Sequence, residues 1–327
     1  MDSKELYDFI ASRTSQCKIL VVGDVMLDKY YYGEVTRISP EAPVPVTHVL
    51  SEKETLGGAA NVAHNLALLG CETSIAGFMG DDYHGKTLLE KFADIGIDVE
   101  GLVKTGRPTT TKLRIIGGHQ QMLRLDFEEA SPVTGKDAAL FLNFIDQKIK
   151  NGIDCVILSD YGKGVCTEEN CRHIIETCHA QVIPVIVDPK GTHWAKYENA
   201  DYITPNLKEI NEVLSDPISN EDDAVEEAAH EVMEKFHLKN IMVTRSEAGL
   251  SLVSDRGATH IPTRAQEVFD VSGAGDTVIA VFSLGIAGGI APEDSAWLAN
   301  LAASVVVAKL GTYAISEKEL MAALKED

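Results

Sequence analysis

The stretch Asp270-Val-Ser-Gly-Ala-Gly-Asp-Thr277 joins a strand-like segment, 265–270, to an apolar run without proline, 278–288. A glycine-rich turn followed by such a run predicts that a helix begins here. The first amides of a helix have no acceptor within the helix, and the helix dipole adds partial positive charge at the same end. The stretch therefore predicts a binding site for an anion, of which a phosphate group is the obvious example.

Asp276 is unexpected in this turn, because its carboxylate would repel a bound phosphate. The residue makes chemical sense if it removes the proton from an attacking hydroxyl while the amides hold the phosphoryl group that is transferred. An acidic residue in a first helical turn can also simply complement the helix dipole. The octapeptide alone leaves both interpretations open.

The composition predicts a globular protein with a large core, since 45% of the 327 residues are hydrophobic and 24% are charged. The 29 Lys and Arg residues stand against 50 Asp and Glu, which gives a formal net charge of -21. Nucleic acids and anionic membrane surfaces need a basic footprint, so this balance argues against both as partners. A phosphorylated substrate needs only a local cluster of basic groups and stays compatible.

The six cysteines form no C-x-x-C pair and match no common zinc spacing. Free thiols in a reducing compartment are the favoured interpretation over a metal site or disulfides. The N-terminal residues lack the basic and apolar regions of a secretory signal, and no apolar run approaches the ~20 residues of a membrane span. We therefore expect a cytoplasmic protein.

Four segments read as buried strands that end in polar or charged residues: 18–24, 154–160, 181–188 and 200–205. From residue 136 onward such strands alternate with helical segments, which is typical of a parallel sheet with helical crossovers. Ligands of these sheets bind beyond the carboxyl ends of the strands. Asp24 and Asp28 follow the first strand and are candidates to bind sugar hydroxyls, although Asp28 suits a turn equally well.

Two further segments, at about 29–50 and 107–127, are rich in β-forming residues but unsuited to the centre of a sheet. The first contains three prolines, and the second has a glycine pair between two β-runs. We expect them to form β-ribbons that pair into a lid, because phosphoryl transfer requires that water is excluded. Open ribbon edges also favour pairing between two copies of the chain.

Between the two ribbons, Gly57 and Gly58 precede a helical segment whose first turn contains Asn61. Paired glycines let a ligand approach the backbone closely, and the Asn61 amide offers both a donor and an acceptor. A glycine turn with a solvated asparagine is the alternative. The small residues Ala299, Ala302 and Ala303 in the last long helix leave room for a flat ring such as adenine, or for close helix packing.

With these residues identified, the chain resembles the ribokinase-like carbohydrate kinase family over nearly its whole length. The resemblance rests on two glycine motifs, Gly57-Gly-Ala-Ala-Asn61 and Gly273-Ala-Gly-Asp276, in the same order about 210 residues apart. It implies one α/β kinase domain over residues 1–327, a three-layer α/β/α sandwich with a mostly parallel sheet and a small β-ribbon lid. Asp-Val-Ser replaces the family's commoner Asp-Thr-Thr before the second motif, which leaves a monovalent cation near Asp270 open.

Four shorter segments look like those of the heptose-7-phosphate kinases of lipopolysaccharide core synthesis: 39–46, 159–164, 187–191 and 204–209. This likeness implies ATP-dependent phosphorylation of the anomeric 1-hydroxyl of D-glycero-β-D-manno-heptose 7-phosphate, on the route to ADP-heptose. Some such kinases are fused to a C-terminal nucleotidyltransferase that acts later. Because this chain ends at Asp327, we expect either the stand-alone form or a piece cut from the fused protein, and a homodimer through the lid.

For the reaction itself, the resemblance implies that Asp276 is the base and that backbone amides form the anion site, those of Gly273, Ala274 and Gly275. It also implies a set of residues along the nucleotide, namely Asn206, Lys208, Glu209, Thr244, Gly249 and Asn300. Asn206 and Glu209 match the positions that organise the ATP phosphates and, partly through water, Mg²⁺.

On the acceptor side, the resemblance implies a set that holds the sugar hydroxyls, namely Asp24, Asp28, Gly57, Gly58 and Asn61. For the phosphate already on the substrate we nominate three basic residues: Arg124, Lys163 and, in reserve, Lys190. Each of them could equally be a surface or ion-pair residue.

Three alternatives remain on the sequence alone. The first is a kinase of the same mechanism for another sugar, such as a hexose or a 2-keto-3-deoxy acid. The second is a dinucleotide-dependent oxidoreductase, which would need a Gly-x-Gly-x-x-Gly motif after the first strand that residues 22–27 lack. The third is a non-catalytic sugar-sensing module with the same fold.

Overall fold

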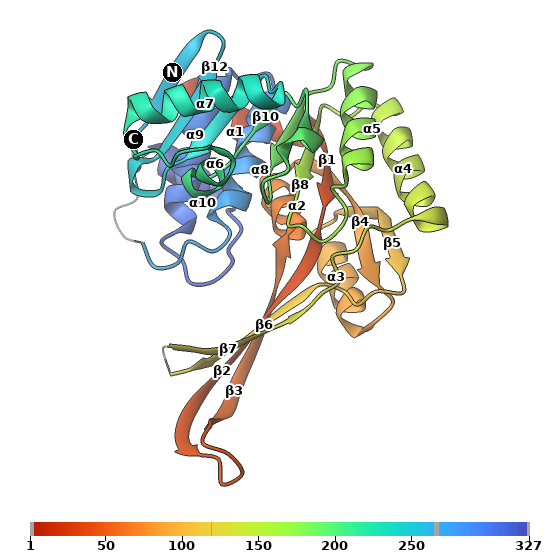
Figure 1. Ribbon diagram of the computed structural model, residues 1–327, viewed down its shortest axis with the longest axis vertical. Coiled ribbons are helices and arrows are strands. Elements are labelled where there is room, and N and C mark those ends of the chain that lie inside the picture. The colour runs from red at the N-terminus through yellow and green to blue at the C-terminus, as the bar shows by residue number, and fades with distance from the viewer. Residues whose placement is uncertain (1–2, 119, 265–267, 326–327) are drawn as a thin grey trace.

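The computed structural model describes residues 3–118, 120–264 and 268–325. Within them, a nine-stranded sheet lies between two layers of helices, and a four-stranded sheet extends from one end of this body (Figure 1). The large sheet is parallel except at one edge, where β11, β12 and β13 pair antiparallel. This is the mostly parallel α/β/α sandwich that the sequence predicts. Along the sheet the order of strands is β13-β12-β11-β10-β9-β8-β1-β4-β5.

The strands of the large sheet have the following bounds: β1 Lys18–Gly23, β4 Glu72–Gly80, β5 Asp98–Thr105, β8 Cys155–Ser159, β9 Val185–Asp188, β10 Tyr202–Ile203, β11 Asn240–Thr244, β12 Leu250–Ser254 and β13 Gly257–Ile261. Each of the four strands predicted from buried apolar segments is present. The predicted hairpin-like pair of segments before the octapeptide is β11 with β12.

The central strand β1 shows why both faces of the sheet are covered. Successive side chains of a strand point to opposite faces. Ile19 and Val21 join the apolar core on one face, whereas Leu20 and Val22 join the core on the other. All four are fully buried, so the strand needs helices on both sides to keep its apolar side chains from water.

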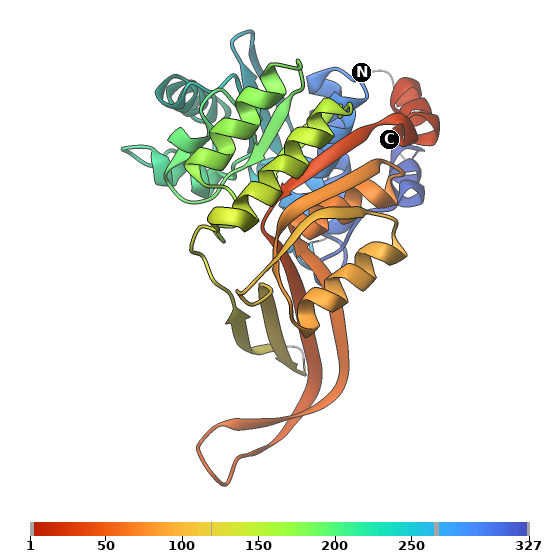
Figure 2. The ribbon, with the colours of Figure 1, turned by 90° about the vertical axis from the view of Figure 1, so that its right-hand side faces the viewer.

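The helices divide accordingly. One core contains residues of α1 Ser3–Ser12, α2 Ala59–Leu68, α3 Tyr83–Asp94, α8 Ala274–Ala287, α9 Pro292–Val306 and α10 Glu317–Lys325. The other contains residues of α4 Gly135–Lys150, α5 Glu168–His179, α6 Leu207–Val213 and α7 Asp222–Phe236. Figure 2 shows α4 and α5 side by side over this second face. No helix in the described ranges has the length and apolarity needed to cross a membrane.

Short 3₁₀ turns complete the body: η1 Thr14–Gln16, η2 Trp194–Tyr197 and η3 Ser246–Ala248. All six cysteines are buried and free, as the sequence predicts.

The sequence also predicts a strand-like segment at 265–270, before α8. Residues 265–267 lie outside the described ranges, and residues 268–270 form no strand. Instead the amides of Phe269 and Asp270 both donate to the carbonyl of Val307, which ties the approach to the end of α9.

The parallel register brings the strand ends together. Gly23 of β1 lies opposite Ser159 of β8, and Ser159 lies opposite Asp188 of β9. A parallel bridge between Asn206 and Thr244 continues this edge toward β11. The polar residues that follow the strands therefore gather along one edge of the sheet, as the repeated pattern of the sequence predicts.

The small sheet consists of β3 Pro45–Gly58, β2 Val25–Ile38, β6 Thr111–Gly117 and β7 Gln120–Phe127, in that order, and is called the ribbon sheet below. The two predicted ribbons do pair, through β2 and β6. The first ribbon is longer than expected, because β2 begins two residues after β1 and β3 runs on to the start of α2. Only the root of the ribbon sheet touches the body, and its far end extends away from it (Figures 1 and 2).

Candidate active site

The start of α8 has the geometry of an anion site. Gly273 adopts a φ of 83°, a left-handed conformation that strongly favours glycine, and the helix begins at the next residue. The amides of Gly273 and Gly275 meet no acceptor within the described residues, whereas the amide of Ala274 donates to the carbonyl of Val271 at 3.2 Å. Two of the three predicted amides are therefore available to a phosphate.

Asp276 is buried in the first turn of α8, with a partner on each carboxylate oxygen. The Tyr161 hydroxyl donates to Oδ1 at 2.5 Å, and Nδ2 of Asn61 donates to Oδ2 at 2.8 Å. A Cβ at Gly273 would come within 2.9 Å of the same Asn61 nitrogen, which is a second reason for glycine there. The two glycine motifs of the sequence thus meet around one carboxylate.

Burial raises the pKa of Asp276 to about 6. The hydrogen bonds from Tyr161 and Asn61 oppose this rise, as does the positive charge of Lys112, while the negative charge of Asp28 adds to it. A carboxyl group whose pKa lies near the working pH is well suited to general base catalysis, because it is both ionised and reasonably basic.

A cavity of about 170 Å³ opens in front of this carboxylate and is called the Asp276 cavity. Its lining combines the start of α8 with residues of the ribbon sheet: Met26, Asp28, Gly58, Lys112, Arg114, Tyr161, Ser272, Gly273, Asp276 and Thr312. The far half of the ribbon sheet contributes nothing to this lining. The predicted lid therefore takes part in the site through its root.

A second and larger cavity, of about 440 Å³, lies between α8, α9 and β11–β12. Thr244, Gly249 and Asn300, which we predicted to lie along the nucleotide, all line it. Ala303 lines it as well, so this small residue leaves open space rather than only packing against a helix. We call this space the α8–α9 cavity.

The two cavities meet at the start of α8. Gly273 and Asp276 line the Asp276 cavity, whereas Ala274 and Gly275 line the α8–α9 cavity. A group held by the free amides would thus lie between the two spaces. This arrangement suits the transfer of an anionic group from a ligand in one cavity to a hydroxyl in the other.

Asn206 and Glu209 form the capping box of α6, with Asn206 Oδ1 accepting from the Glu209 amide at 2.9 Å. Glu209 Oε1 accepts from Lys190 Nζ at 2.9 Å. The reserve phosphate ligand Lys190 thus lies with the predicted metal-binding pair and not in the Asp276 cavity. Lys208 is exposed and pairs with Glu212 on its own helix.

Asp188, at the end of β9, is a residue that we did not nominate. Its carboxylate has no hydrogen bond or ion pair to any described residue, and burial raises its pKa well above the ordinary value. The carboxylates of Asp276 and Glu209 act in the same direction, so Asp188 lies close enough to both to feel their charges. The segment 187–191 contributed to the resemblance, and the position of Asp188 at a strand end could have singled it out.

Asp24 and Asp28 have different surroundings. Asp24 is buried and accepts from the amides of Tyr161, Lys163 and Val165 at 2.8, 2.9 and 3.2 Å. It lines neither of the two cavities, and its three hydrogen bonds hold the loop after β8. Asp28 lines the Asp276 cavity, where its carboxylate accepts from Arg114.

The glycine pair lies beside Asp28. A Cβ at Gly57 would come within 2.4 Å of Asp28 Oδ2, and Gly58 has a φ of 56° and lines the Asp276 cavity. Any side chain at Gly57 would displace the carboxylate from its position. The pair therefore permits the close approach of β3 to β2 at the edge of the cavity.

The structure takes Arg124 and Lys163 away from the Asp276 cavity. Arg124 pairs with Asp126 on its own strand at 2.9 Å, and Lys163 pairs with Glu128 at 2.8 Å. The basic residues that line the cavity are Lys112 and Arg114 instead. Both come from β6 and are two positions apart, so alternation along the predicted strand could have indicated that they share a face.

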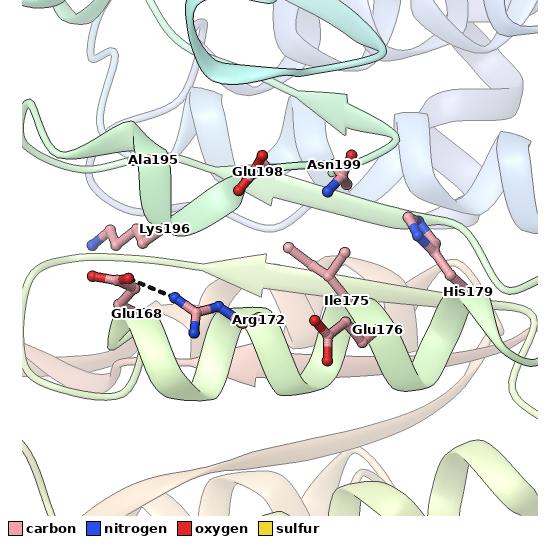
Figure 3. A pocket seen from close by; sticks show the side chains of 9 residues that line it. All are labelled: Glu168, Arg172, Ile175, Glu176, His179, Ala195, Lys196, Glu198 and Asn199. Carbon is pink, nitrogen blue, oxygen red and sulfur yellow. Dashed lines mark hydrogen bonds and ion pairs between the residues drawn. The ribbon is translucent and has the colours of Figure 1, made fainter.

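Two other features are not part of this site. Asp270 accepts from the amides of Ser272 and Gly311 at 2.9 and 3.0 Å, so it closes the loop before α8. A cavity of about 170 Å³ between α5 and η2 contains none of the predicted residues (Figure 3). Its charged side chains compensate one another, as in the pair of Arg172 with Glu168 at 2.6 Å.

Comparison with known proteins agrees with this geometry. Residues 16–319 match the pfkB family carbohydrate kinases. Over 326 residues, 99% of the chain, it is 44% identical to the bifunctional protein HldE of Trichlorobacter lovleyi. Over 303 residues, 92% of the chain, it is 46% identical to the bifunctional protein HldE of Methylobacillus flagellatus. The chain spans only 66% and 62% of the length of these curated relatives.

Among solved structures, the ribokinase of Arabidopsis thaliana complexed with ribose and ATP has the same fold. The TM-score is 0.75 at 20% identity, covering 94% of this chain and 99% of the ribokinase. At this level of identity the likeness concerns the fold alone, and it confirms the ribokinase-like fold that the sequence predicts.

Two cavities on either side of one anion-binding turn, with a buried carboxylate between them, are the arrangement expected of an ATP-dependent sugar kinase. The family match covers nearly the whole chain. The chain belongs to the pfkB family of carbohydrate kinases.

Asp276→Asn tests the base directly. We expect turnover to fall by about 10²- to 10⁴-fold, since the amide cannot accept the proton of the attacking hydroxyl. The affinity for ATP, measured by titration calorimetry, should stay within about threefold, because Asp276 faces the acceptor side. Asp81→Asn, at an exposed carboxylate paired with Lys104, is the matched control. Near-normal turnover of Asp276→Asn would remove the assignment.

The pH dependence follows from the raised pKa of Asp276. The base works only when ionised, so kcat/KM should rise about tenfold per pH unit below pH ~6 and level off above it. A sugar phosphate also ionises near pH 6, so the profile is recorded for Asp276→Asn as well. The residual activity of Asp276→Asn should lack the part of the rise below pH ~6 that comes from ionisation of Asp276. Identical profiles for the two proteins would contradict the prediction.

Proposed function

We propose that this kinase phosphorylates the anomeric 1-hydroxyl of D-glycero-β-D-manno-heptose 7-phosphate to give the 1,7-bisphosphate. The four segments of the sequence that look like heptose-7-phosphate kinases support this substrate, and so does the charge of the Asp276 cavity. A nucleotidyltransferase that consumes the 1-phosphate product would then act next, either as a separate protein or on the same longer chain.

Lys112 is the observation that carries the choice of a phosphorylated sugar. Its ammonium group lines the Asp276 cavity and forms no ion pair within the described residues. The ammonium lies over the ring of Tyr161, at 5.7 Å from the centroid. In a chain with a net charge of -21, an ammonium without an ion pair in this cavity favours a substrate that brings its own negative charge.

Arg114 differs from Lys112 in that its charge is already shared. Its Nη1 donates to Asp28 Oδ1 at 2.6 Å, and its guanidinium stacks over the ring of Tyr30 at 5.1 Å. Its remaining donors could still reach an anion, but its first effect is to neutralise Asp28. We therefore assign the phosphate of the substrate chiefly to Lys112.

The site also suits Mg²⁺. Asp188 supplies an unpartnered carboxylate, and Asn206 and Glu209 supply further oxygen atoms nearby. No group of three or more His, Cys, Asp or Glu within the described part of the chain forms a complete metal site. Mg²⁺ suits such a partial site, because it is usually held by a few carboxylates together with phosphate oxygens and water. When bound, the ion neutralises charge on the ATP phosphates.

The residues of the chain then divide the remaining work. Residues of the α8–α9 cavity, such as Thr244 and Asn300, bind the nucleotide, and the free amides of Gly273 and Gly275 receive the γ-phosphoryl group. Lys112 binds the phosphate of the sugar. Asp276 accepts the proton of the 1-hydroxyl as its oxygen attacks, which forms the new P–O bond while the bond to ADP breaks. The proposal leaves room for a monovalent cation near Asp270, to be tested by comparing K⁺ with a bulky cation.

Lys112→Met tests the substrate. The KM for heptose 7-phosphate should rise about 10- to 100-fold, the worth of a charged hydrogen bond, and the KM for unphosphorylated heptose should change less than about twofold. ADP release from a panel of phosphorylated and unphosphorylated sugars gives both values. Lys163→Met is the matched control, because that ammonium pairs with Glu128 outside the cavity.

Three outcomes of this panel would contradict the proposal. If a 2-keto-3-deoxy acid were the best acceptor, Lys112 would bind a carboxylate and the chain would be a sugar-acid kinase. If no sugar released ADP, the non-catalytic alternative would gain support. An equal effect of Lys112→Met on phosphorylated and neutral sugars would show that Lys112 does not bind the phosphate.

We also propose that two copies pair through the ribbon sheet. β7 is the edge strand, and its alternate residues Leu123, Leu125 and Phe127 share one face with exposed fractions of 50%, 40% and 46%. An apolar, unpaired edge strand of this kind is stabilised when a second sheet covers it. A second copy brings the same apolar face and therefore suits a twofold interface.

The double variant Leu123→Glu/Leu125→Glu tests this dimer. Four buried carboxylates would face one another across the interface, so we expect the molar mass in analytical ultracentrifugation to fall from that of two chains to that of one. Leu140→Glu, at an exposed leucine of α4, is the control and should leave the mass unchanged. A single-chain mass for the unmodified protein at micromolar concentration would contradict the proposal.

A further inference from the structure

We propose that Tyr161 is a positioning residue for the base: its hydroxyl holds the Asp276 carboxylate ionised and oriented toward the acceptor hydroxyl. The inference rests on the proposed role of Asp276 as the base of the kinase. It gives a function to a residue that we did not nominate from the sequence.

The hydrogen bond between Tyr161 and Asp276 is short, and it leaves Asp276 able to accept a proton. The Tyr161 hydroxyl donates to Asp276 Oδ1 at 2.5 Å, and Asn61 donates to Oδ2 at 2.8 Å. Each oxygen of a carboxylate has two acceptor positions, so one position on each remains for an incoming hydroxyl. With a donor fixed on either side, the carboxylate cannot rotate freely, and its remaining lone pairs point in set directions.

The loop that holds Tyr161 is itself fixed. Its amide donates to Asp24 at 2.8 Å, together with the amides of Lys163 and Val165, and the Gly162 amide donates to Asp160 at 2.6 Å. The buried Asp24 carboxylate thus binds this loop. Such anchoring is expected if the Tyr161 hydroxyl must be held in a fixed position.

The charges around Asp276 explain why a donor is needed. Burial and the carboxylate of Asp28 both favour the protonated form of Asp276. Lys112 favours the ionised form, but a substrate phosphate bound to Lys112 cancels that effect. When the substrate is present, the hydrogen bonds of Tyr161 and Asn61 are what keep the base ionised.

Tyr161 is suited to this role because it stays a donor. Burial and the neighbouring Asp276 carboxylate raise its pKa well above the ordinary value, so its hydroxyl keeps its proton throughout the working range of the enzyme. The Lys112 ammonium lies over its ring and further restricts the side chain. A phenylalanine would fill the same space without the donor.

Tyr161→Phe is the first test. Losing a hydrogen bond to the ionised form raises the pKa of Asp276, so the acid limb of kcat/KM should move about one unit to higher pH. Activity should fall about tenfold below pH 6 and approach that of the unmodified protein near pH 9. The KM for ATP should stay within about twofold. The substrate's own ionisation is common to both proteins and cancels in the comparison.

Tyr313→Phe is the matched control. It removes a tyrosine–carboxylate hydrogen bond, 2.8 Å to Glu319, from a site that lines neither cavity and does not hold the Tyr161 loop. Its loss should lower the unfolding temperature without moving the acid limb. An equal shift in both variants would show that the limb reports stability rather than a contact with the base.

A second variant keeps the inference testable if Tyr161→Phe does not fold. 3-Fluorotyrosine at position 161 has nearly the same shape but a more acidic hydroxyl, so it should move the acid limb to lower pH. An unchanged limb in both variants, with the limb present in the unmodified protein, overturns the role of Tyr161 alone. Absence of the limb from the unmodified protein would instead overturn Asp276 as the base.

Discussion

The main constraint on this structure is that the Asp276 carboxylate is buried, although burial disfavours its charge. The free amides at the start of α8 attract negative charge, whereas the surrounding apolar core penalises it. Asp276 tolerates this position because Tyr161 and Asn61 donate to its two oxygens. Asn61 lies 215 residues away in the sequence, so the fold must bring α2 and α8 together before the base exists.

The same principle accounts for the uneven distribution of charge. A chain of net charge -21 repels anionic ligands at long range, yet both proposed ligands of the kinase carry phosphates. We propose that local groups rather than the net charge attract these ligands. These groups are the helix amides on the donor side and Lys112 on the acceptor side. Basic residues elsewhere, such as Arg124 and Lys163, are paired with carboxylates and add little to the field.

Much of this arrangement could be predicted from the sequence, because it follows from local patterns. The glycine turn before an apolar run specifies a helix start, and polar residues after buried strands specify the edge at which ligands bind. Thr244 and Asn300, by contrast, were implied by the family resemblance, and both line the α8–α9 cavity. Pairing between distant segments could not be predicted in this way. Lys112 and Tyr161 matter only because β6 and the loop after β8 meet α8.

The basic residues nominated for the substrate phosphate show what local reasoning leaves out. Lys163 was nominated as a basic residue at a predicted strand end and Arg124 as one within the second predicted ribbon, but a nearby carboxylate weakens the attraction of either charge for a ligand. Asp126 lies two residues from Arg124 on the same strand, so the sequence alone already indicated that Arg124 could form an ion pair. Glu128 reaches Lys163 from a different segment, and only the fold shows that pair.

The root of the ribbon sheet links these observations. Arg114 neutralises Asp28, whose negative charge would otherwise raise the pKa of Asp276 further. Lys112, two residues earlier on β6, adds positive charge to the same cavity. A displacement of β6 would therefore change both the proposed anion site and the pKa of Asp276. Because β6 pairs with β7 at the edge of the ribbon sheet, any partner that fixes this sheet also fixes the electrostatic environment of the base.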